Sequence, residues 1–215
     1  MEVAAIIPAY NEARTIGPIL AVLQKCPRIK QVIVVSDGST DATVKVARTF
    51  KGVEVVDLPS NIGKGGAIMA GLNRTRAEVL LFLDADLIGL NPAHVNRLLD
   101  PVLGLKAPMA VGVFERGRVA TDLAQKMAPF LSGQRALQRS LLEKVAGLDL
   151  SRFGMEVVLH RYMEDHGIPT VTVELPDLSH VLKEEKLGIW KGLLARLQMY
   201  WEIIKYAAKV SLHFR

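Results

Sequence analysis

The sequence predicts an α/β fold in which a mostly parallel sheet is flanked by helices on both faces. Over the first hundred residues, apolar runs rich in β-branched residues alternate with stretches of helical spacing. This rhythm is typical of consecutive right-handed βα units. The chain has 215 residues and half of them are apolar, which is enough to bury a complete sheet between two layers of helices.

The elements follow in order along the chain. Strands are predicted at VAAII, QVIVV, VEVVDL and VLLFL, and helices at about 12–25, 40–50, 64–76 and 91–103. A further strand is predicted at 108–115, and the segment LSGQRALQRSLLEKVAGLD is expected to form a loop and a short helix. GMEVVLHRYMEDHG then predicts a helix and TVTVEL a strand. Without an internal repeat or a linker, we expect one domain over 1–186 and a separate helix over 187–215.

Composition indicates a globular protein in a reducing compartment. Charged residues make up 23% of the chain, and the single cysteine, Cys26, excludes an intramolecular disulfide. The segment MEVAAIIPAYNE lacks the basic start of a signal peptide. No stretch reaches the roughly 18 uninterrupted apolar residues of a membrane span. We therefore expect a cytoplasmic protein, with peripheral contact to a membrane as the alternative.

The segment from about Gly188 to Phe214 is predicted to form an amphipathic helix. One face carries Trp190, Leu194, Leu197, Trp201, Ile204 and Ala208, and the other Lys191, Gln198, Glu202, Lys205 and Lys209. From Leu187 to the last residue, the chain contains five Lys or Arg and one Glu. This segment therefore carries +4 of the net charge of +5. The helix is expected to pack on its own domain, to form a homodimer, or to bind an anionic membrane surface. The rest of the chain is nearly neutral, and no nucleic-acid partner is expected.

Polar clusters follow three of the predicted strands. PAYNE comes after the first strand, SDGSTD after the second and DAD after the fourth. Ligands of open parallel sheets bind beyond the carboxyl ends of the strands. The three clusters therefore predict a binding site at one edge of the sheet.

Asp84 and Asp86 place two carboxylates directly after a strand that reads as buried on both faces. Such close carboxylates repel each other unless a divalent cation that prefers oxygen, Mg²⁺ or Mn²⁺, neutralises them. A nucleotide diphosphate would complete the coordination of that ion. The alternative is a pair of acids that caps a turn.

The second cluster combines a tight turn with a carboxylate. Gly38 permits a tight turn between the strand and the following helix. Ser39, Thr40 or Asp41 can cap the N-terminus of that helix. Asp37 lies at the strand tip, where it could accept hydrogen bonds from a base or a ribose. A turn with a purely structural role is the alternative.

The segment NIGKGGAI carries Gly63, Gly65 and Gly66 around Lys64 just before a predicted helix. This combination suits the approach of a phosphate or a ribose. It matches neither the phosphate-binding loop of nucleoside triphosphatases nor the dinucleotide fingerprint.

Taken together, IIPAYNEARTI, VVSDGSTDAT, NIGKGGAIMAG and FLDADL resemble glycosyltransferase family 2, over residues 3 to 180 or so. The resemblance implies a Rossmann-like fold of the A type that binds nucleotide sugars. It also implies that Asp86 binds the metal that bridges the donor's diphosphate. The donor-binding residues implied are Pro8, Ala9, Tyr10, Glu12, Asp37, Lys64, Gly65, Asp84 and Ala85.

The second half resembles the acceptor side of the family, where Ser132, Gly133, Gln134 and Arg135 would border the sugar. Many inverting members carry a Glu-Asp pair whose Asp is the general base, whereas Glu156 is followed here by Val157. In this respect the chain is similar to polyprenyl-phosphate glycosyltransferases and to glucosyl-3-phosphoglycerate synthase. The catalytic residues implied are Asp86, Arg135 and Glu156, while Glu164 and Asp165 are interpreted as solvated.

His180 follows the last predicted strand and a proline, and the resemblance implies that it is a further metal ligand. Imidazole nitrogen would complete a site otherwise made of oxygens. The alternative is a histidine without a ligand role, as expected for His94, His160 and His166 on predicted helices.

The resulting hypothesis is an enzyme that moves a hexose from a nucleotide-diphosphate sugar, UDP-glucose or similar, to a small phosphorylated acceptor such as 3-phosphoglycerate. The alternatives are a polyprenyl-phosphate hexosyltransferase at the membrane surface and a non-catalytic protein that binds nucleotide sugars. A sugar-1-phosphate nucleotidyltransferase would carry a glycine-rich loop with Arg after the first strand, where this chain has PAYNE.

Overall fold

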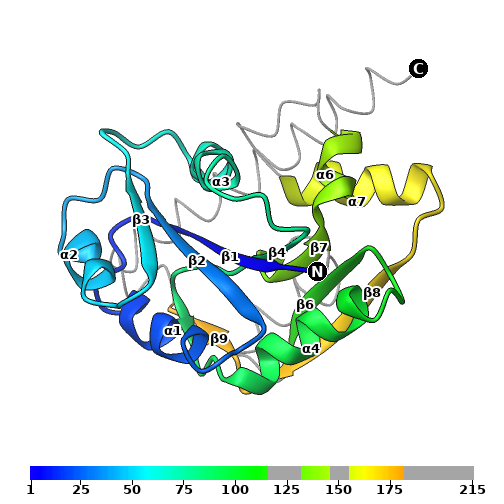
Figure 1. The fold of residues 1–215 in the computed structure, drawn as a ribbon, viewed down its shortest axis with the longest axis horizontal. Coiled ribbons are helices and arrows are strands. Elements are labelled where there is room, and N and C mark those ends of the chain that lie inside the picture. The colour runs from blue at the N-terminus through cyan, green and yellow to red at the C-terminus, as the bar shows by residue number, and fades with distance from the viewer. Residues whose placement is uncertain (116–131, 146–154, 182–215) are drawn as a thin grey trace, which may run out of the picture. The chain divides into compact units, whose positions relative to one another are not determined.

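A computed structural model describes residues 1–115, 132–145 and 155–181 of the chain (Figure 1). The amphipathic helix predicted over 187–215, with its dimer and membrane alternatives, lies outside these residues. Residues Met1–Ser179 form one compact unit.

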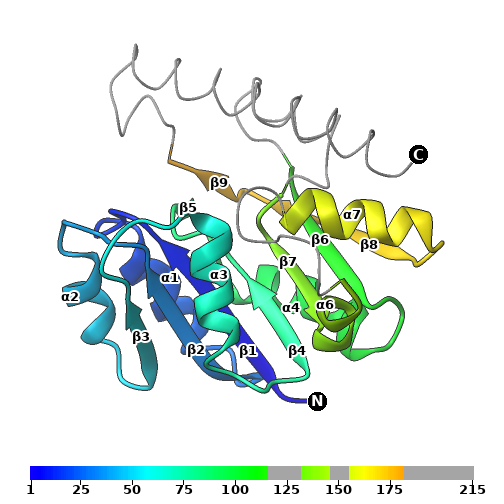
Figure 2. The same cartoon turned by 90° about the horizontal axis from the view of Figure 1, so that it is seen from above.

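A seven-stranded sheet forms the centre of this unit. Its strands lie in the order β3-β2-β1-β4-β7-β6-β8 (Figure 2). The bounds are β1 Val3–Ala9, β2 Ile29–Ser36, β3 Val53–Asp57, β4 Val79–Phe82, β6 Met109–Glu115, β7 Arg135–Gln138 and β8 Thr170–Pro176. Only β7 is antiparallel to its neighbours in the described sheet, so the prediction of a mostly parallel sheet is confirmed. A second sheet pairs β5, Leu87–Ile88, with β9, Ser179–His180.

Helices cover both faces of the sheet. α1 and α4 lie on one face, and α3, α6 and α7 on the other (Figure 1). The bounds are α1 Ile16–Leu23, α2 Thr43–Arg48, α3 Lys64–Leu72, α4 Pro92–Leu103, α6 Arg139–Val145 and α7 Met155–Asp165. Each predicted helix within the described residues is therefore present, with ends shifted by a few residues.

The central strands are apolar throughout because both of their faces are covered. Ala5 and Ile7 of β1 belong to the hydrophobic core that also contains the buried side chains of α1 and α4. Ile6 points to the other face, where Gly71 of α3 lies so close that a Cβ would approach Ile6 Cγ2 to 2.6 Å. Since successive side chains of a strand point to opposite faces, alternate residues of β1 fill both layers.

The structure corrects one element. The segment that we expected to be a loop and a short helix contains the strand β7 before α6. β7 is only four residues long, too short for a clear periodic pattern, and it forms by pairing with β4 and β6 on its two sides. Tertiary pairing, rather than local pattern, decides its conformation.

Among the described helices, none combines the length and the apolar character needed to cross a membrane.

Candidate active site

The predicted polar clusters meet at one edge of the sheet. β1, β2 and β4 are parallel neighbours, so their carboxyl ends lie side by side, with Ala9 paired to Ser36 and Ile6 to Phe82. β7 runs the opposite way, and therefore its first residue, Arg135, pairs with Phe82 at the end of β4. The reversed strand thus brings 132–135 to the same edge as the three predicted clusters.

The loop after β1 is held to the loop after β2. Asn11 has a positive φ of 56°, and its Oδ1 accepts hydrogen bonds from the N–H groups of Thr40 at 2.8 Å and Asp41 at 3.3 Å. The carboxylate of Asp41 in turn accepts from the N–H groups of Ala13 and Thr43. Burial alone would raise the pKa of Asp41, but the hydrogen bonds from Thr43 and Ala13 lower it. Asp41, which directly precedes the N-cap of α2, therefore stabilises the start of this helix through its hydrogen bond from the Thr43 N–H.

The predicted donor residues of the first loop differ in exposure. Pro8 and Ala9 end β1, and Tyr10 is 49% exposed beyond it. Glu12 is half-buried; its N–H donates to Thr43 Oγ1 at 2.7 Å, and its Oε2 accepts from the Thr15 hydroxyl at 3.1 Å. Of these residues, Tyr10 offers the most exposed surface for a ligand.

Asp37 is buried, with 4% of its surface exposed. Its Oδ1 accepts from the N–H of Ile62 at 2.7 Å and its Oδ2 from the N–H of Gly63 at 3.0 Å. Gly63 is the N-cap of α3, and Lys64 is the first residue of that helix. The contacts of Asp37 therefore fix the position at which α3 begins. The structure thus gives Asp37 a structural contact, and its contact with a nucleoside stays a prediction.

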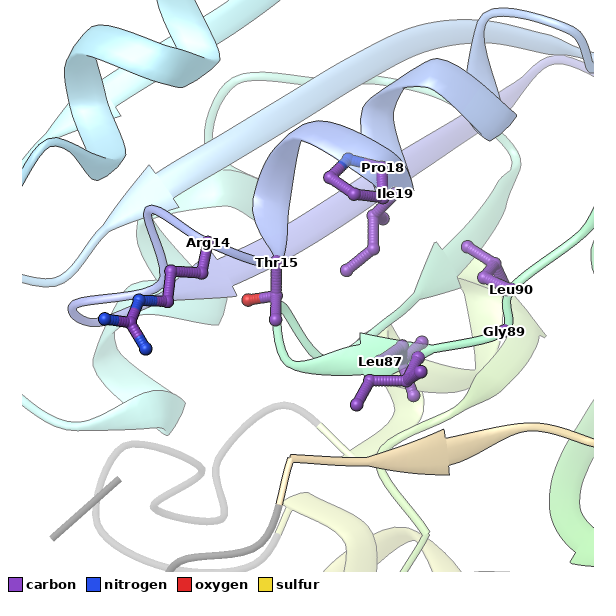
Figure 3. A pocket seen from close by; sticks show the side chains of 8 residues that line it. Arg14, Thr15, Pro18, Ile19, Leu87, Gly89 and Leu90 are labelled. Carbon is purple, nitrogen blue, oxygen red and sulfur yellow. The ribbon is translucent and has the colours of Figure 1, made fainter. Parts of the chain in front are cut away.

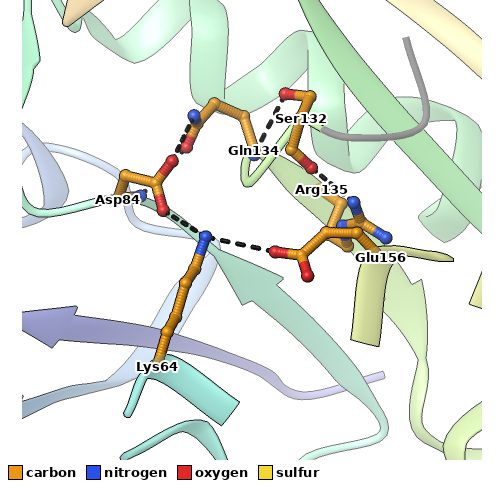
Figure 4. A network of polar contacts seen from close by, with 6 residues as sticks. All are labelled: Lys64, Asp84, Ser132, Gln134, Arg135 and Glu156. Carbon is orange, nitrogen blue, oxygen red and sulfur yellow. Dashed lines mark hydrogen bonds and ion pairs between the residues drawn. The ribbon is translucent and has the colours of Figure 1, made fainter. Parts of the chain in front are cut away.

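Lys64 links two carboxylates from distant parts of the sequence (Figure 4). Its Nζ lies 2.7 Å from Oδ1 of Asp84, just after β4, and 3.1 Å from Oε1 of Glu156 on α7. The resemblance implied both Lys64 and Glu156 as site residues, but nothing in the sequence indicated that they meet.

The charges of this cluster stabilise one another. Burial would lower the pKa of Lys64, but the carboxylates of Asp84 and Glu156 outweigh it and raise the pKa above its ordinary value. Burial would raise the pKa of Glu156, but the cations of Lys64 and Arg135 lower it. Lys64 and Glu156 are therefore both charged near neutral pH.

Gln134 lies directly against Asp84 (Figure 4). Gln134 accepts the N–H of Asp84 with Oε1 and donates from Nε2 to Asp84 Oδ2, both at 2.9 Å. A Cβ on Gly133 would lie 2.3 Å from the same Oδ2. Arg135 is buried, and its Nη2 donates to the carbonyl of Ser132. The sequence placed Gln134 beside the sugar but gave no sign of its bonds to Asp84.

Three side chains form a group that could hold a metal ion. One ligand atom each from Asp84, Asp86 and His180 lie within 4.8 Å of one another, and all three side chains are partly buried. Two carboxylates and an imidazole fit a divalent cation such as Mn²⁺. The residues predicted as metal ligands, Asp86 and His180, are thus near each other, and Asp84 lies with them.

The polar residues interpreted as structural or solvated lie elsewhere. Glu164 and Asp165 are largely exposed; Glu164 lies 3.4 Å from His160 Nε2, and Asp165 forms an ion pair with Arg161, each one turn away on α7. His94 is buried on α4 with its Nε2 2.9 Å from the carbonyl oxygen of Pro176, and burial lowers its pKa. Its contact joins α4 to the end of β8, which is a packing role.

A pocket lies between the start of α1 and the segment around β5 (Figure 3). Its lining consists of Arg14, Thr15, Pro18, Ile19, Leu87, Ile88, Gly89 and Leu90. None of these is a predicted site residue, although the pocket adjoins Glu12 through Thr15 and Asp86 through Leu87.

Fold and site together define a protein of the glycosyltransferase class. The family model for glycosyl transferase family 2 matches residues 4–160, and the chain belongs to this family. Dodecaprenyl-phosphate galacturonate synthase of Rhizobium johnstonii is 25% identical over 170 residues, which cover 75% of this chain and 48% of that protein. Dolichyl-phosphate beta-glucosyltransferase of Drosophila melanogaster is 42% identical over 101 residues, 40% of this chain and 31% of that protein.

The chain is also similar to solved structures. The crystal structure of glucosyl-3-phosphoglycerate synthase from Mycobacterium tuberculosis with Mn²⁺ and UDP-glucose has a TM-score of 0.69 and 26% identity. The match covers 84% of this chain and 71% of that one. The chain spans about half or less of the length of the curated relatives named above.

Proposed function

We propose that this chain transfers a hexose from a nucleotide-diphosphate sugar, UDP-glucose or a similar donor, to a small phosphorylated acceptor such as 3-phosphoglycerate. The observation that carries the proposal is the ammonium of Lys64 at the edge of the sheet, held by Asp84 and Glu156 beside the Asp84, Asp86 and His180 group. Glucosyl-3-phosphoglycerate synthase has been crystallised with UDP-glucose, Mn²⁺ and phosphoglyceric acid, which supports this donor, metal and acceptor class.

Each residue of the cluster has a proposed part in the reaction. Asp86 and His180 would hold Mg²⁺ or Mn²⁺, which when bound neutralises the charge of the diphosphate leaving group. Lys64 supplies a further fixed positive charge near that group. Asp84 offers its carboxylate to the donor sugar, and the loops at Tyr10 and Asp37 hold the nucleoside.

Glu156 is proposed to accept a hydrogen bond rather than to act as a strong base. Its lowered pKa keeps the carboxylate ionised but makes it a weak proton acceptor. The attacking phosphate oxygen of a lipid-phosphate acceptor is already ionised, and the hydroxyl proton of 3-phosphoglycerate would pass to an oxygen of the departing diphosphate. The absence of an Asp at position 157 therefore prevents neither reaction. Arg135 lowers the pKa of Glu156 and thereby favours its charged form.

A lipid-phosphate acceptor is the second candidate, because two of the curated relatives are a dodecaprenyl-phosphate and a dolichyl-phosphate glycosyltransferase. Both acceptor classes present a phosphate, so the site described above serves either. The two candidates differ in where the acceptor resides, in water or at a membrane surface.

The experiment has two stages. UDP- and GDP-sugars are screened for thermal stabilisation that requires Mn²⁺, and the best donor is then incubated with 3-phosphoglycerate or with polyprenyl phosphate in detergent. Product with 3-phosphoglycerate supports the first candidate, and product with polyprenyl phosphate alone supports the second. Stabilisation without transfer or donor hydrolysis would indicate a non-catalytic binding protein, and the absence of any stabilisation would contradict the donor class.

A further inference from the structure

The side chain of Gln134 is bonded to Asp84 at two points. Its Oε1 accepts the Asp84 N–H, and its Nε2 donates to Asp84 Oδ2, each at 2.9 Å (Figure 4). One amide group therefore contacts both the backbone and the carboxylate of the same residue. Among common side chains of this length, only a primary amide offers an acceptor and a donor side by side at neutral pH.

Gln134 is itself held firmly. It is fully buried, with 0% of its surface exposed. Its carbonyl oxygen accepts the N–H of Gly112 on β6 at 2.8 Å, and its own N–H donates to Ser132 Oγ at 3.2 Å. The backbone of Gln134 is thus anchored to the neighbouring strand, and its buried side chain holds Asp84 from that fixed position.

Because of this contact, the two oxygens of the Asp84 carboxylate have different partners. Oδ2 receives the Gln134 amide, while Oδ1 lies 2.7 Å from Lys64 Nζ. Gly133 closes the space beside Oδ2, since any Cβ there would overlap it. Rotation of the carboxylate would break the Gln134 contact or the Lys64 contact, and both hydrogen bonds involve a charged group.

We infer that Gln134 is a positioning residue, which fixes the orientation of Asp84 so that Oδ1 faces Lys64 and the donor side of the crevice. The inference rests on the proposed function for its effect on turnover, but not for its effect on Asp84 itself. Gln134 acts through Asp84 and is not assigned a contact with the reacting atoms.

The test compares two substitutions of Gln134 with a matched control. Gln134→Glu keeps the shape and an acceptor for the Asp84 N–H but replaces the donor to Oδ2 by a second negative charge. Gln134→Met removes both bonds. Gln31→Met is the control, because the side chain of Gln31 also makes two hydrogen bonds, to Glu54 and to the carbonyl of Arg74, but at the opposite edge of the sheet.

Turnover is measured per folded molecule, so that a loss of stability alone does not register. Both Gln134 variants should lower kcat for the donor by about tenfold or more, the effect of losing one hydrogen bond to a charged group. Gln31→Met should keep the wild-type kcat. A Gln134→Met protein with wild-type kcat would overturn the inference, because the bonds to Asp84 would then have no role.

Hydrogen exchange of the Asp84 amide gives a readout that needs no donor. Gln134→Met should accelerate this exchange by about tenfold or more, and Gln31→Met should leave it unchanged. Unchanged exchange in Gln134→Met would overturn the inference. If the wild-type chain turns over no nucleotide sugar, the proposed function fails, and the exchange measurement alone decides the role of Gln134.

Discussion

Lys64 and Glu156 belong to distant parts of the sequence, yet the Nζ of the first lies 3.1 Å from Oε1 of the second. Lys64 begins α3, which follows β3, whereas Glu156 is in the first turn of α7. Asp84 completes the contact from the end of β4. This bridge joins the donor half of the proposed site to its acceptor half.

The ion pair predicts a pH-dependent contribution to stability. The pKa of Glu156 in the folded protein lies below its ordinary value of 4.5, so this contribution is complete above pH 4.5 and is lost as the pH falls through the folded pKa. The pKa of Lys64 lies above its ordinary value of 10.5, so its contribution is complete below pH 10.5 and is lost as the pH rises through the folded pKa. The pair should therefore stabilise the fold by a constant amount between about pH 5 and pH 10.

The measurement is the difference in melting temperature between the wild type and Glu156→Gln as a function of pH. Glu156→Gln should melt lower than the wild type across the plateau, and the difference should shrink on the acidic side. Glu164→Gln, which removes an exposed carboxylate of the same helix, is the control and should show little difference. A difference that grows on acidification would contradict the ion-pair assignment.

Asp86→Ala should abolish metal-dependent turnover and leave the fold intact. A half-buried carboxylate just after a strand contributes little to packing, whereas Asp86 is one of the two carboxylates in the group with Asp84 and His180 that could hold the metal ion. Activity with Mn²⁺ and circular dichroism are measured together. Asp165→Ala, at an exposed position on α7, serves as the control. Wild-type activity of Asp86→Ala with Mg²⁺ or Mn²⁺ would show that the metal assignment is wrong.

Asp37→Asn should weaken both the fold and the binding of the donor. An amide nitrogen cannot accept the N–H of Ile62 or Gly63, so one of the two part-buried hydrogen bonds to this side chain is lost. The loss should cost about 1–3 kcal/mol of the free energy of unfolding. Since the same turn begins α3, donor affinity measured by calorimetry should fall as well.

Asp57→Asn is the control for this substitution. Asp57 ends β3, and its carboxylate is substantially exposed, with an ion pair to Arg48 at 3.8 Å. Its replacement should change stability by less than about 1 kcal/mol. Equal stability of Asp37→Asn and the wild type in urea would contradict the buried contacts, and unchanged donor affinity would confine Asp37 to a structural turn.

Gly133→Ala should displace the Asp84 carboxylate. A Cβ at this position would lie 2.3 Å from Oδ2, which no side chain tolerates without movement. We expect donor turnover to fall by about tenfold or more, measured as kcat on folded protein. Gly17→Ala is the control, because a Cβ there meets Val46 at an ordinary 3.5 Å. Retention of wild-type kcat by Gly133→Ala would mean that Asp84 can move without consequence.

Much of the fold could be predicted because its signals are local. The alternation of β-branched runs with helical spacing predicts the parallel strands and their helices, and the polar clusters after β1, β2 and β4 predict the edge where they meet. β7 escaped prediction because four residues carry no clear period, and its pairing partners are far away in the sequence. The contact of Gln134 with Asp84 depends on that strand and could not be predicted either.

The sequence by itself determined the fold class, the family and the residue types at the edge of the sheet, because the succession of elements along the chain and the spacing of the motifs are short-range patterns. Only the tertiary structure decided which of these groups touch. It buries Asp37 under the turn at Gly63, places Lys64 between Asp84 and Glu156, and sets Gln134 on both the backbone and the carboxylate of Asp84. The physical reason is that an antiparallel strand inserted beside β4 brings a late segment to the edge built by the early ones, and no local pattern encodes that return.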